Sequence, residues 1–286
     1  MAIDYEKLKA WDFGEQVVEW TWEKSALYAL GVGLGFDPID PDQLGFTYEP
    51  DMLALPTMAV VVAPSNFWLR DPATGVDWKR VVHGEEGITL HRTLLPQGRF
   101  VTRSRVDEII DKGQGKGALI YMTREVSDAD TGEAVATITR TTFCRGDGGF
   151  GGPSGPVRPV HQLPERAPDH TCDLPTLPQQ ALIYRLNGDG NPLHADPDVA
   201  REAGFERPIL HGLCTFGVAG HALLKTLCGY DPSRLKRFDV RFSAPVFPGE
   251  TIRTEMWRDG NKVSFRAQVL ERDVVVLNNG YAEVMA

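Results

Sequence analysis

The segment between residues 146 and 178 constrains the fold most, because it divides the chain into two halves of similar size. It is rich in glycine at its start and in proline after that. Proline and glycine without a periodic apolar pattern predict an extended connector that crosses the surface. Residues 1–145 and 179–286 are therefore expected to form two halves, with residues 146–178 as the connector between them.

Both halves repeat one order of elements. An apolar segment at residues 55–62 occupies the place that the longer apolar helix expected at 212–227 has in the second half. Segments with two-residue alternation follow each of them, and such alternation indicates strands with one buried face. The expected strands cover residues 99–103, 118–126 and 134–143, and then 251–257, 263–270 and 274–284. Because both halves contain a helix followed by antiparallel strands, the sequence predicts an α+β fold whose two halves can join their sheet edges.

The second half alone contains a tight turn with three polar side chains, which runs Asn-Gly-Asp-Gly-Asn-Pro-Leu-His from Asn187 to His194. Its glycines permit backbone angles that other residues resist, and its proline fixes φ. The turn can therefore direct Asp189, Asn191 and His194 into one small volume. A carboxylate and an imidazole that share one water form a general acid/base pair. The alternative is an ordinary capped turn with a surface histidine, because Asp, Asn and Gly are common turn residues.

A helix start follows this turn at Ile209-Leu210-His211-Gly212-Leu213. The first N–H groups of a helix have no partner within it, and the helix dipole favours negative charge there. The Gly212 N–H is therefore a candidate donor for an oxyanion, and the alternative is a packing glycine. We interpret His211 as an N-cap or core histidine rather than a second base. We assign no catalytic role to His221 in the helix or to His91 in a strand.

The turn and the helix start resemble the signature of the (R)-specific enoyl-CoA hydratases 2, the MaoC-like branch of the hot-dog fold. The resemblance covers nearly the whole chain, and its blocks occur in the family's order. In the second half it rests on residues 184–197, 207–217 and 241–249. In the first half, residues 28–33, 55–57, 82–85 and 111–113 are similar to the hydratase 2 unit of peroxisomal multifunctional enzyme type 2.

The resemblance implies a double hot-dog, in which two central helices are wrapped by antiparallel sheets. It implies reversible hydration of (2E)-enoyl-CoA to (3R)-3-hydroxyacyl-CoA. The first half would accommodate the acyl chain, and the second half would carry catalysis. Its catalytic residues would be Asp189, His194 and Asn191, with Gly212 in the oxyanion hole. The matching substrate-binding positions are His83, Gly84, Lys112, Tyr184 and Phe242. Lys112 also fits a charged hairpin turn.

Composition limits the partners. The net charge of -9 argues against nonspecific nucleic-acid binding, so any coenzyme A site must be a local basic patch. The four cysteines show no zinc-finger spacing and predict a reduced compartment. No apolar run approaches the length of a membrane span, and the first residues lack the features of a signal peptide. We therefore expect a cytoplasmic homodimer that takes acyl-CoA as substrate, uses no metal or further cofactor and binds no membrane. His161 and His170 in the connector are expected to be solvated.

Two other functions remain open. A hot-dog thioesterase would also combine a carboxylate, a water and a helix N-terminus, but it would release a free thiol. A protein that binds acyl-CoA without turnover would have no need of Asp189, Asn191 and His194 together. A dinucleotide-binding domain is excluded, because the alternating glycines at residues 31–35 do not fit its G-x-G-x-x-G pattern.

Overall fold

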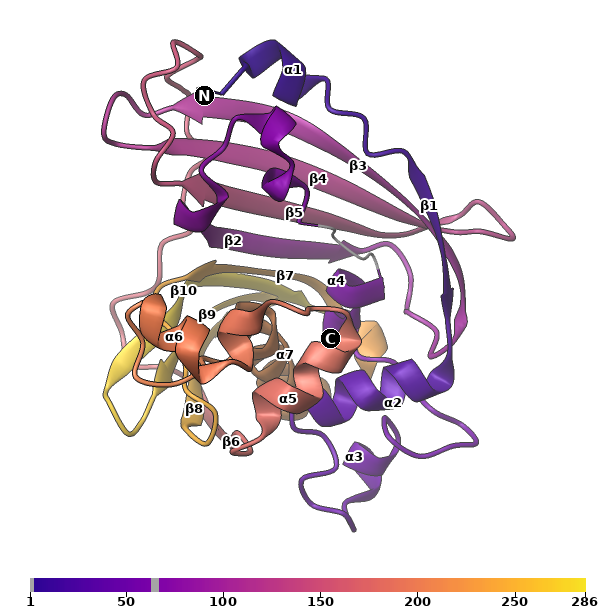
Figure 1. The fold of residues 1–286 in the computed structure, drawn as a ribbon. Coiled ribbons are helices and arrows are strands. Elements are labelled where there is room, and N and C mark those ends of the chain that lie inside the picture. The colour runs from indigo at the N-terminus through magenta and orange to yellow at the C-terminus, as the bar shows by residue number, and fades with distance from the viewer. Residues whose placement is uncertain (1–2, 63–66) are drawn as a thin grey trace.

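The computed structural model describes residues 3–62 and 67–286. Its strands form one ten-stranded antiparallel sheet that bends around the helices (Figure 1). The strands are β1 (Glu15–Trp20), β2 (Val81–Leu90), β3 (Gly98–Asp111), β4 (Ala118–Asp128), β5 (Ala134–Cys144), β6 (His170–Pro175), β7 (Leu235–Phe242), β8 (Thr251–Asp259), β9 (Lys262–Val269) and β10 (Val274–Val284).

The helices are mostly short. The α-helices are α1 (Tyr5–Lys9), α2 (Trp22–Gly31), α3 (Pro41–Leu44), α4 (Ala59–Val62), α5 (Gln180–Tyr184), α6 (Pro197–Glu202) and α7 (Gly212–Cys228). The 3₁₀ turns are η1 (Pro56–Met58), η2 (Trp68–Arg70), η3 (Pro72–Thr74), η4 (Trp78–Arg80), η5 (Arg185–Asn187), η6 (Pro192–His194) and η7 (Pro232–Arg234). None of the helices in the described residues is long and apolar enough to cross a lipid bilayer.

The strand order shows that the chain is an internal repeat. The sheet runs β1-β3-β4-β5-β2 through the first half and then β7-β10-β9-β8-β6 through the second. Each half therefore places its second strand at the centre of the molecule and its first strand at the outer edge. The two central strands, β2 and β7, pair antiparallel from Glu85–Arg241 to Thr89–Arg237. The expected joining of sheet edges, and with it the double hot-dog architecture, is confirmed.

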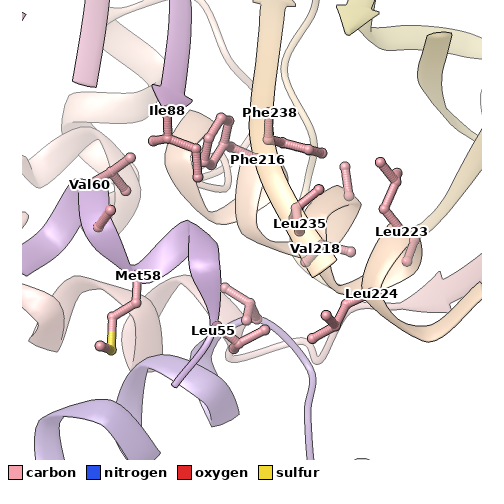
Figure 2. Close-up of a cluster of buried hydrophobic side chains, with 14 of the residues drawn as sticks. Leu55, Met58, Val60, Ile88, Phe216, Val218, Leu223, Leu224, Leu235 and Phe238 are labelled. Carbon is pink, nitrogen blue, oxygen red and sulfur yellow. The ribbon is translucent and has the colours of Figure 1, made fainter. Parts of the chain in front are cut away.

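Helix α7 forms the centre of the hydrophobic core. It is apolar over most of its circumference, and such a helix is stable only when it is buried on all sides. Phe216, Val218, Leu223 and Leu224 are each no more than 2% exposed. Figure 2 shows these side chains beside residues of the first half and of the two central strands, namely Leu55, Met58, Val60, Ile88, Leu235 and Phe238. This core cluster therefore takes side chains from both halves, and a smaller second cluster lies within the first half.

The corresponding helix of the first half is shorter in the part of the chain that the structure describes. There it consists of η1 and the single turn α4, whereas α7 has 17 residues. Three of the four residues of α4 are valines, and β-branched residues have low helix propensity.

The segment from 146 to 178 differs from the expectation of a simple extended connector. Residues 170–175 form β6, which pairs with β8 and corresponds in the repeat to β1. The prediction that His161 is solvated holds only in part, because its side chain is half-buried. Its Nε2 lies 2.8 Å from the Ser264 hydroxyl and its ring lies 5.1 Å from that of Tyr281, because the connector runs along β9 and β10. His170 is exposed as predicted.

Candidate active site

The turn before α6 is built by its own side chains. Turn η5 ends at Gly188, whose φ of 104° lies in the left-handed region that glycine adopts without strain. An Asp189 oxygen accepts a hydrogen bond from the Asn191 N–H at 3.1 Å, and the Asn191 side chain accepts one from the Leu193 N–H at 3.2 Å. Pro192 then opens η6, which ends at His194. These bonds hold Asp189 and His194 on one side of a rigid turn.

His194 is buried and its ring has a defined orientation. Its Nδ1 lies 2.9 Å from the Ile209 carbonyl oxygen, which can only accept, so Nδ1 carries the proton and Nε2 is left as an acceptor. The side chain is 8% exposed, and burial lowers the pKa of His194 below its usual value. At neutral pH the ring is therefore neutral and its Nε2 can accept a proton.

A second imidazole lies against the first. The ring of His211 stacks on the ring of His194, with centroids 3.8 Å apart and planes 28° from parallel. One ring nitrogen of each histidine and a carboxylate oxygen of Asp189 all lie within 4.8 Å of one another. Burial, together with the neighbouring His194, lowers the pKa of His211 to about 4. Three polar groups therefore converge on one small volume.

The same three groups are close enough to be considered as ligands of a metal ion. A zinc ion binds imidazole nitrogen at about 2.1 Å and in the plane of the ring. Because the rings are stacked with centroids 3.8 Å apart, an ion at that distance from both nitrogens would lie further out of the ring planes than a water oxygen about 2.8 Å from both. The stacked arrangement therefore suits a water molecule better than it suits a metal.

A cavity of about 500 Å³ lies beside this group and is formed by both halves. His194 lines it from the second half, and residues 82–85 of β2 line it from the first. Its walls are largely apolar, with contributions from Leu119, Phe143, Val246 and Val276. The junction between the halves, and not either half alone, therefore forms the space for a ligand.

The N-terminus of α7 opens onto the same cavity. Gly212 is the first residue of α7 and lines the cavity together with His194. The preceding His211 makes no side-chain capping bond, so the first N–H groups of the helix are not satisfied by the N-cap side chain. A Cβ at Gly212 would lie 3.2 Å from the ring of Phe242. Glycine therefore allows the cavity wall to approach the backbone closely.

The positions on β2 that are predicted to bind substrate are held by a buried ion pair. His83 lines the cavity, its ring lies 4.5 Å from that of Phe242, and its Nε2 lies 2.8 Å from an oxygen of Glu86. Arg140 binds both Glu86 oxygens, at 2.8 and 2.9 Å. Burial alone would raise the pKa of Glu86, but Arg140 and His83 outweigh burial and hold it at about 2. Gly84 lies beside His83, at a register shift in the β2–β5 pairing.

Positive charge gathers where the cavity meets the surface. Lys112, Arg145 and Arg241 are exposed and line the cavity. Lys112 lies in the turn between β3 and β4, where its N–H donates to the Gly117 carbonyl at 3.1 Å, so it is also a hairpin residue. Arg158 lines the cavity too, but it pairs with Asp107 at 3.0 Å. The local basic patch that the sequence required is therefore present in a chain of net charge -9.

Comparison with known proteins decides the family. Residues 159–279 match the MaoC like domain, and residues 19–146 match the MFE-2 hydratase 2 N-terminal domain. The chain is 40% identical to 3-hydroxyacyl-thioester dehydratase Y of Mycobacterium tuberculosis, with 100% of both chains covered. The chain belongs to the MaoC-like dehydratase family.

Two further relatives agree with this assignment. The peroxisomal enoyl-CoA hydratase 2 of Arabidopsis thaliana is 38% identical, and the match covers 91% of this chain and 88% of that protein. The crystal structure of a MaoC-like dehydratase from Phytophthora capsici is 35% identical, covers 98% of each chain and superposes with a TM-score of 0.85. The resemblance found in the sequence, and the fold that it implied, are confirmed.

Three expected site residues of this MaoC-like dehydratase do not line the cavity, namely Asp189, Tyr184 and Asn191. Tyr184 is 1% exposed and packs against the rings of His211, at 5.1 Å, and Tyr28, at 6.1 Å. It lies behind the stacked histidines and not in the wall of the cavity. Asn191 is exposed, and its side-chain oxygen caps η6. Their roles as substrate-binding and catalytic residues stay predictions.

Sequence reasoning missed two features of the dehydratase site. It gave His211 only an N-cap or core role; the structure does place it at the N-cap and bury it, but beside His194. The sequence did contain a signal that His211 lies near the site, because His211 directly precedes Gly212. No comparable signal in the sequence pointed to the Glu86–Arg140 pair. The two residues are 54 positions apart, and only the β2–β5 register makes them direct neighbours.

Proposed function

We propose that this MaoC-like dehydratase catalyses the reversible hydration of (2E)-enoyl-CoA to (3R)-3-hydroxyacyl-CoA. The observation that carries the proposal is the convergence of Asp189 and His194 beside a cavity that the N-terminus of α7 also lines. Hydration of a conjugated thioester needs three functions in one place: a base for water, a proton source for Cα and a donor for the thioester oxygen. The proposed site offers candidates for all three.

In the proposed reaction, His194 Nε2 draws a proton from the water as the water oxygen bonds to Cβ. The electron pair of the double bond moves toward the thioester oxygen, and the Gly212 N–H stabilises the charge that develops there. The Asp189 carboxylate faces the imidazolium that forms. The proton then passes to Cα, so the acid/base pair returns to its starting state. Positioned acid/base groups of this kind contribute roughly 10²–10⁴-fold to rate.

The cavity also suits the two ends of the substrate. Its apolar walls can accept an acyl chain. The exposed cations Lys112, Arg145 and Arg241 can pair with the phosphates of coenzyme A. No chemical step in this account requires a metal or a further cofactor.

The test is one incubation of the purified protein with a (2E)-enoyl-CoA, monitored for two signals. We expect loss of the enoyl thioester absorbance without release of free thiol, and a product of (3R) configuration. Release of thiol would instead identify a thioesterase. Binding of the enoyl-CoA with neither signal would identify a non-catalytic acyl-CoA-binding protein.

A further inference from the structure

His211 is a buried polar side chain without a well-formed hydrogen bond. It is 1% exposed, and neither of its ring nitrogens makes a hydrogen bond of normal geometry to the described residues, although the backbone of Asp189 lies near the ring. Buried polar atoms in native proteins are almost always paired with protein groups or with ordered water. An imidazole left unpaired inside a well-packed protein is therefore evidence for a ligand or a water at its free nitrogen.

A second buried histidine, within α7, shows that burial alone does not produce this state. His221 is also 1% exposed, yet its Nδ1 lies 3.4 Å from the Val32 carbonyl oxygen and its Nε2 lies 3.3 Å from the Tyr230 hydroxyl. His221 thus has partners on both nitrogens, whereas His211, the N-cap of α7, has no hydrogen bond of normal geometry on either. His211 stands next to the proposed acid/base pair.

The position of His211 identifies what its nitrogen can bind. Three atoms that lie within 4.8 Å of one another, on Asp189, His194 and His211, can all be at hydrogen-bonding distance, about 2.8 Å, from one oxygen. A water there can donate one hydrogen to His194 Nε2 and one to the Asp189 carboxylate, because both only accept. One lone pair of its oxygen must attack Cβ of the substrate. The other lone pair needs a donor, and a neutral imidazole has one N–H to give.

We propose that His211 is a third group of the water site, whose N–H donates to the water oxygen and so directs the remaining lone pair at Cβ. The proposal rests on the proposed function. It explains why two imidazoles lie face to face, since one ring accepts from the water and the other donates to it. Burial and the neighbouring His194 lower the pKa of His211 to about 4, so the ring is neutral at physiological pH and does not compete with His194 for the proton.

The test replaces His211 with phenylalanine, which keeps a flat ring against His194 but has no N–H. We expect kcat for enoyl-CoA hydration to fall roughly 10- to 100-fold through loss of water orientation, with KM changed less than about twofold. The melting temperature should not fall, because replacing an unpaired buried polar group by an apolar one of similar shape is neutral or stabilising. His211→Asn, which restores an N–H donor, should recover part of kcat.

His221→Phe is the matched control. It removes a buried histidine from α7, the helix that His211 precedes, and a cavity of about 220 Å³ beside His221 can accept the larger ring. It should keep kcat while lowering the melting temperature, because it leaves the Tyr230 hydroxyl unpaired. The two histidines are thus expected to affect activity and stability in opposite ways.

A kcat of His211→Phe within about threefold of wild type would overturn the proposal, and so would a fall in kcat that His211→Asn does not relieve at all. A high-resolution crystal structure of the wild-type protein without substrate decides the question even if the variants do not fold. It should show a water within hydrogen-bonding distance of Asp189, His194 and His211, and a dry site would contradict the proposal. Wild-type protein that does not hydrate enoyl-CoA would instead contradict the proposed function, whatever that crystal structure shows.

Discussion

Asp189 and His194 are five positions apart, and the turn that joins them holds each by a different means. Asp189 is half-buried and receives the Asn191 N–H, so one carboxylate oxygen is engaged by the backbone. His194 is buried and fixed through Nδ1 to Ile209. A hydrogen bond on one ring nitrogen sets the tautomer of the other. The local backbone therefore determines which atom of each residue remains available for chemistry.

Buried neutral histidines should make the stability of this protein sensitive to acid. Burial lowers the pKa of both His211 and His221 to about 4, whereas an unfolded histidine titrates near 6.5. Between these two pH values the histidines are protonated in the unfolded chain but stay neutral in the folded protein. Protonation therefore favours the unfolded chain, and the stability present above pH 6.5 is lost as the pH falls to 4. Each pKa unit corresponds to about 1.4 kcal/mol.

We therefore expect the free energy of unfolding, measured by urea denaturation, to fall by several kcal/mol from pH 7 to pH 4.5. His211→Phe and His221→Phe should each flatten this dependence. The explanation fails if stability is constant over that interval or rises as the pH falls.

At the scale of elements, α7 connects the core to the site. Its apolar middle packs against both halves of the sheet, and its N-terminus places Gly212 in the cavity wall and follows directly on His211, which stacks on His194. Two of its glycines allow close packing against the first half. A Cβ at Gly217 would lie 2.4 Å from Val32 Cγ1, and one at Gly220 would lie 2.4 Å from Thr57 Cγ2. The position of the helix N-terminus thus depends on contacts with the other half.

Alanine at Gly217 or Gly220 should therefore destabilise the protein, although alanine favours helix. Overpacking costs about 1–3 kcal/mol, and the gain in helix propensity offsets about 1 kcal/mol of that. Gly190→Ala is the control, since its φ is not positive and a Cβ there meets nothing within 4 Å. Chemical denaturation should show a lower free energy of unfolding for the two helix variants and little change for the control. Equal stability of all three would mean that α7 has room beside Val32 and Thr57.

The elements also show what the sequence could predict. Strands β4, β5, β8, β9 and β10 were expected within two residues of their ends, whereas β3 was expected only over residues 99–103 and continues to Asp111. The alternation of buried side chains that indicates a strand is clearest in β8 and β9. The central strand β2 gave no clear alternation, since it buries Glu86 and Gly87 beside Ile88. Strand β6 lies among prolines and was included in the connector. Both strands form because they pair with segments far away in the sequence. Such pairing cannot be predicted from the alternation of residues within a single segment.

The same limit applies to the site. The turn from Asn187 to His194 was predictable, because its glycines and proline fix local geometry. The stacking of His211 on His194 required knowledge of how the α7 N-terminus meets that turn. The negative net charge implied that a coenzyme A site would need a local basic patch. Which residues form that patch was not predictable, because Lys112, Arg145 and Arg241 lie at separate strand ends that only the sheet brings together.

At the scale of the whole molecule, the two halves form one unit. The β2–β7 pairing makes the sheet continuous, and one core contains side chains from α2, α4 and α7 as well as from the central strands. The cavity takes its walls from both halves. Catalytic groups on one half and binding groups on the other would then stay in register only if the halves do not separate.

Unfolding should accordingly be a single cooperative transition. Trp20, Trp68 and Trp78 report on the first half and Trp257 on the second, while far-ultraviolet circular dichroism reports on the whole sheet. Denaturation curves from fluorescence and from circular dichroism should coincide. Two separate transitions would show that the halves fold independently. The homodimer and the cytoplasmic location stay predictions, and sedimentation analysis would measure the first of them.

The central claim is that Asp189 and His194 act together on one water, and a double-mutant cycle in kcat tests it most directly. Asp189→Asn, His194→Ala and the double variant are compared with wild type for hydration of a 2-enoyl-CoA, with exposed His170→Ala as control. Each single change should lower kcat by roughly 10²-fold or more. The double variant should be little worse than either, because residues that act as a unit are non-additive. Near-normal turnover in a single variant, or a double effect equal to the product of the two, would contradict the account.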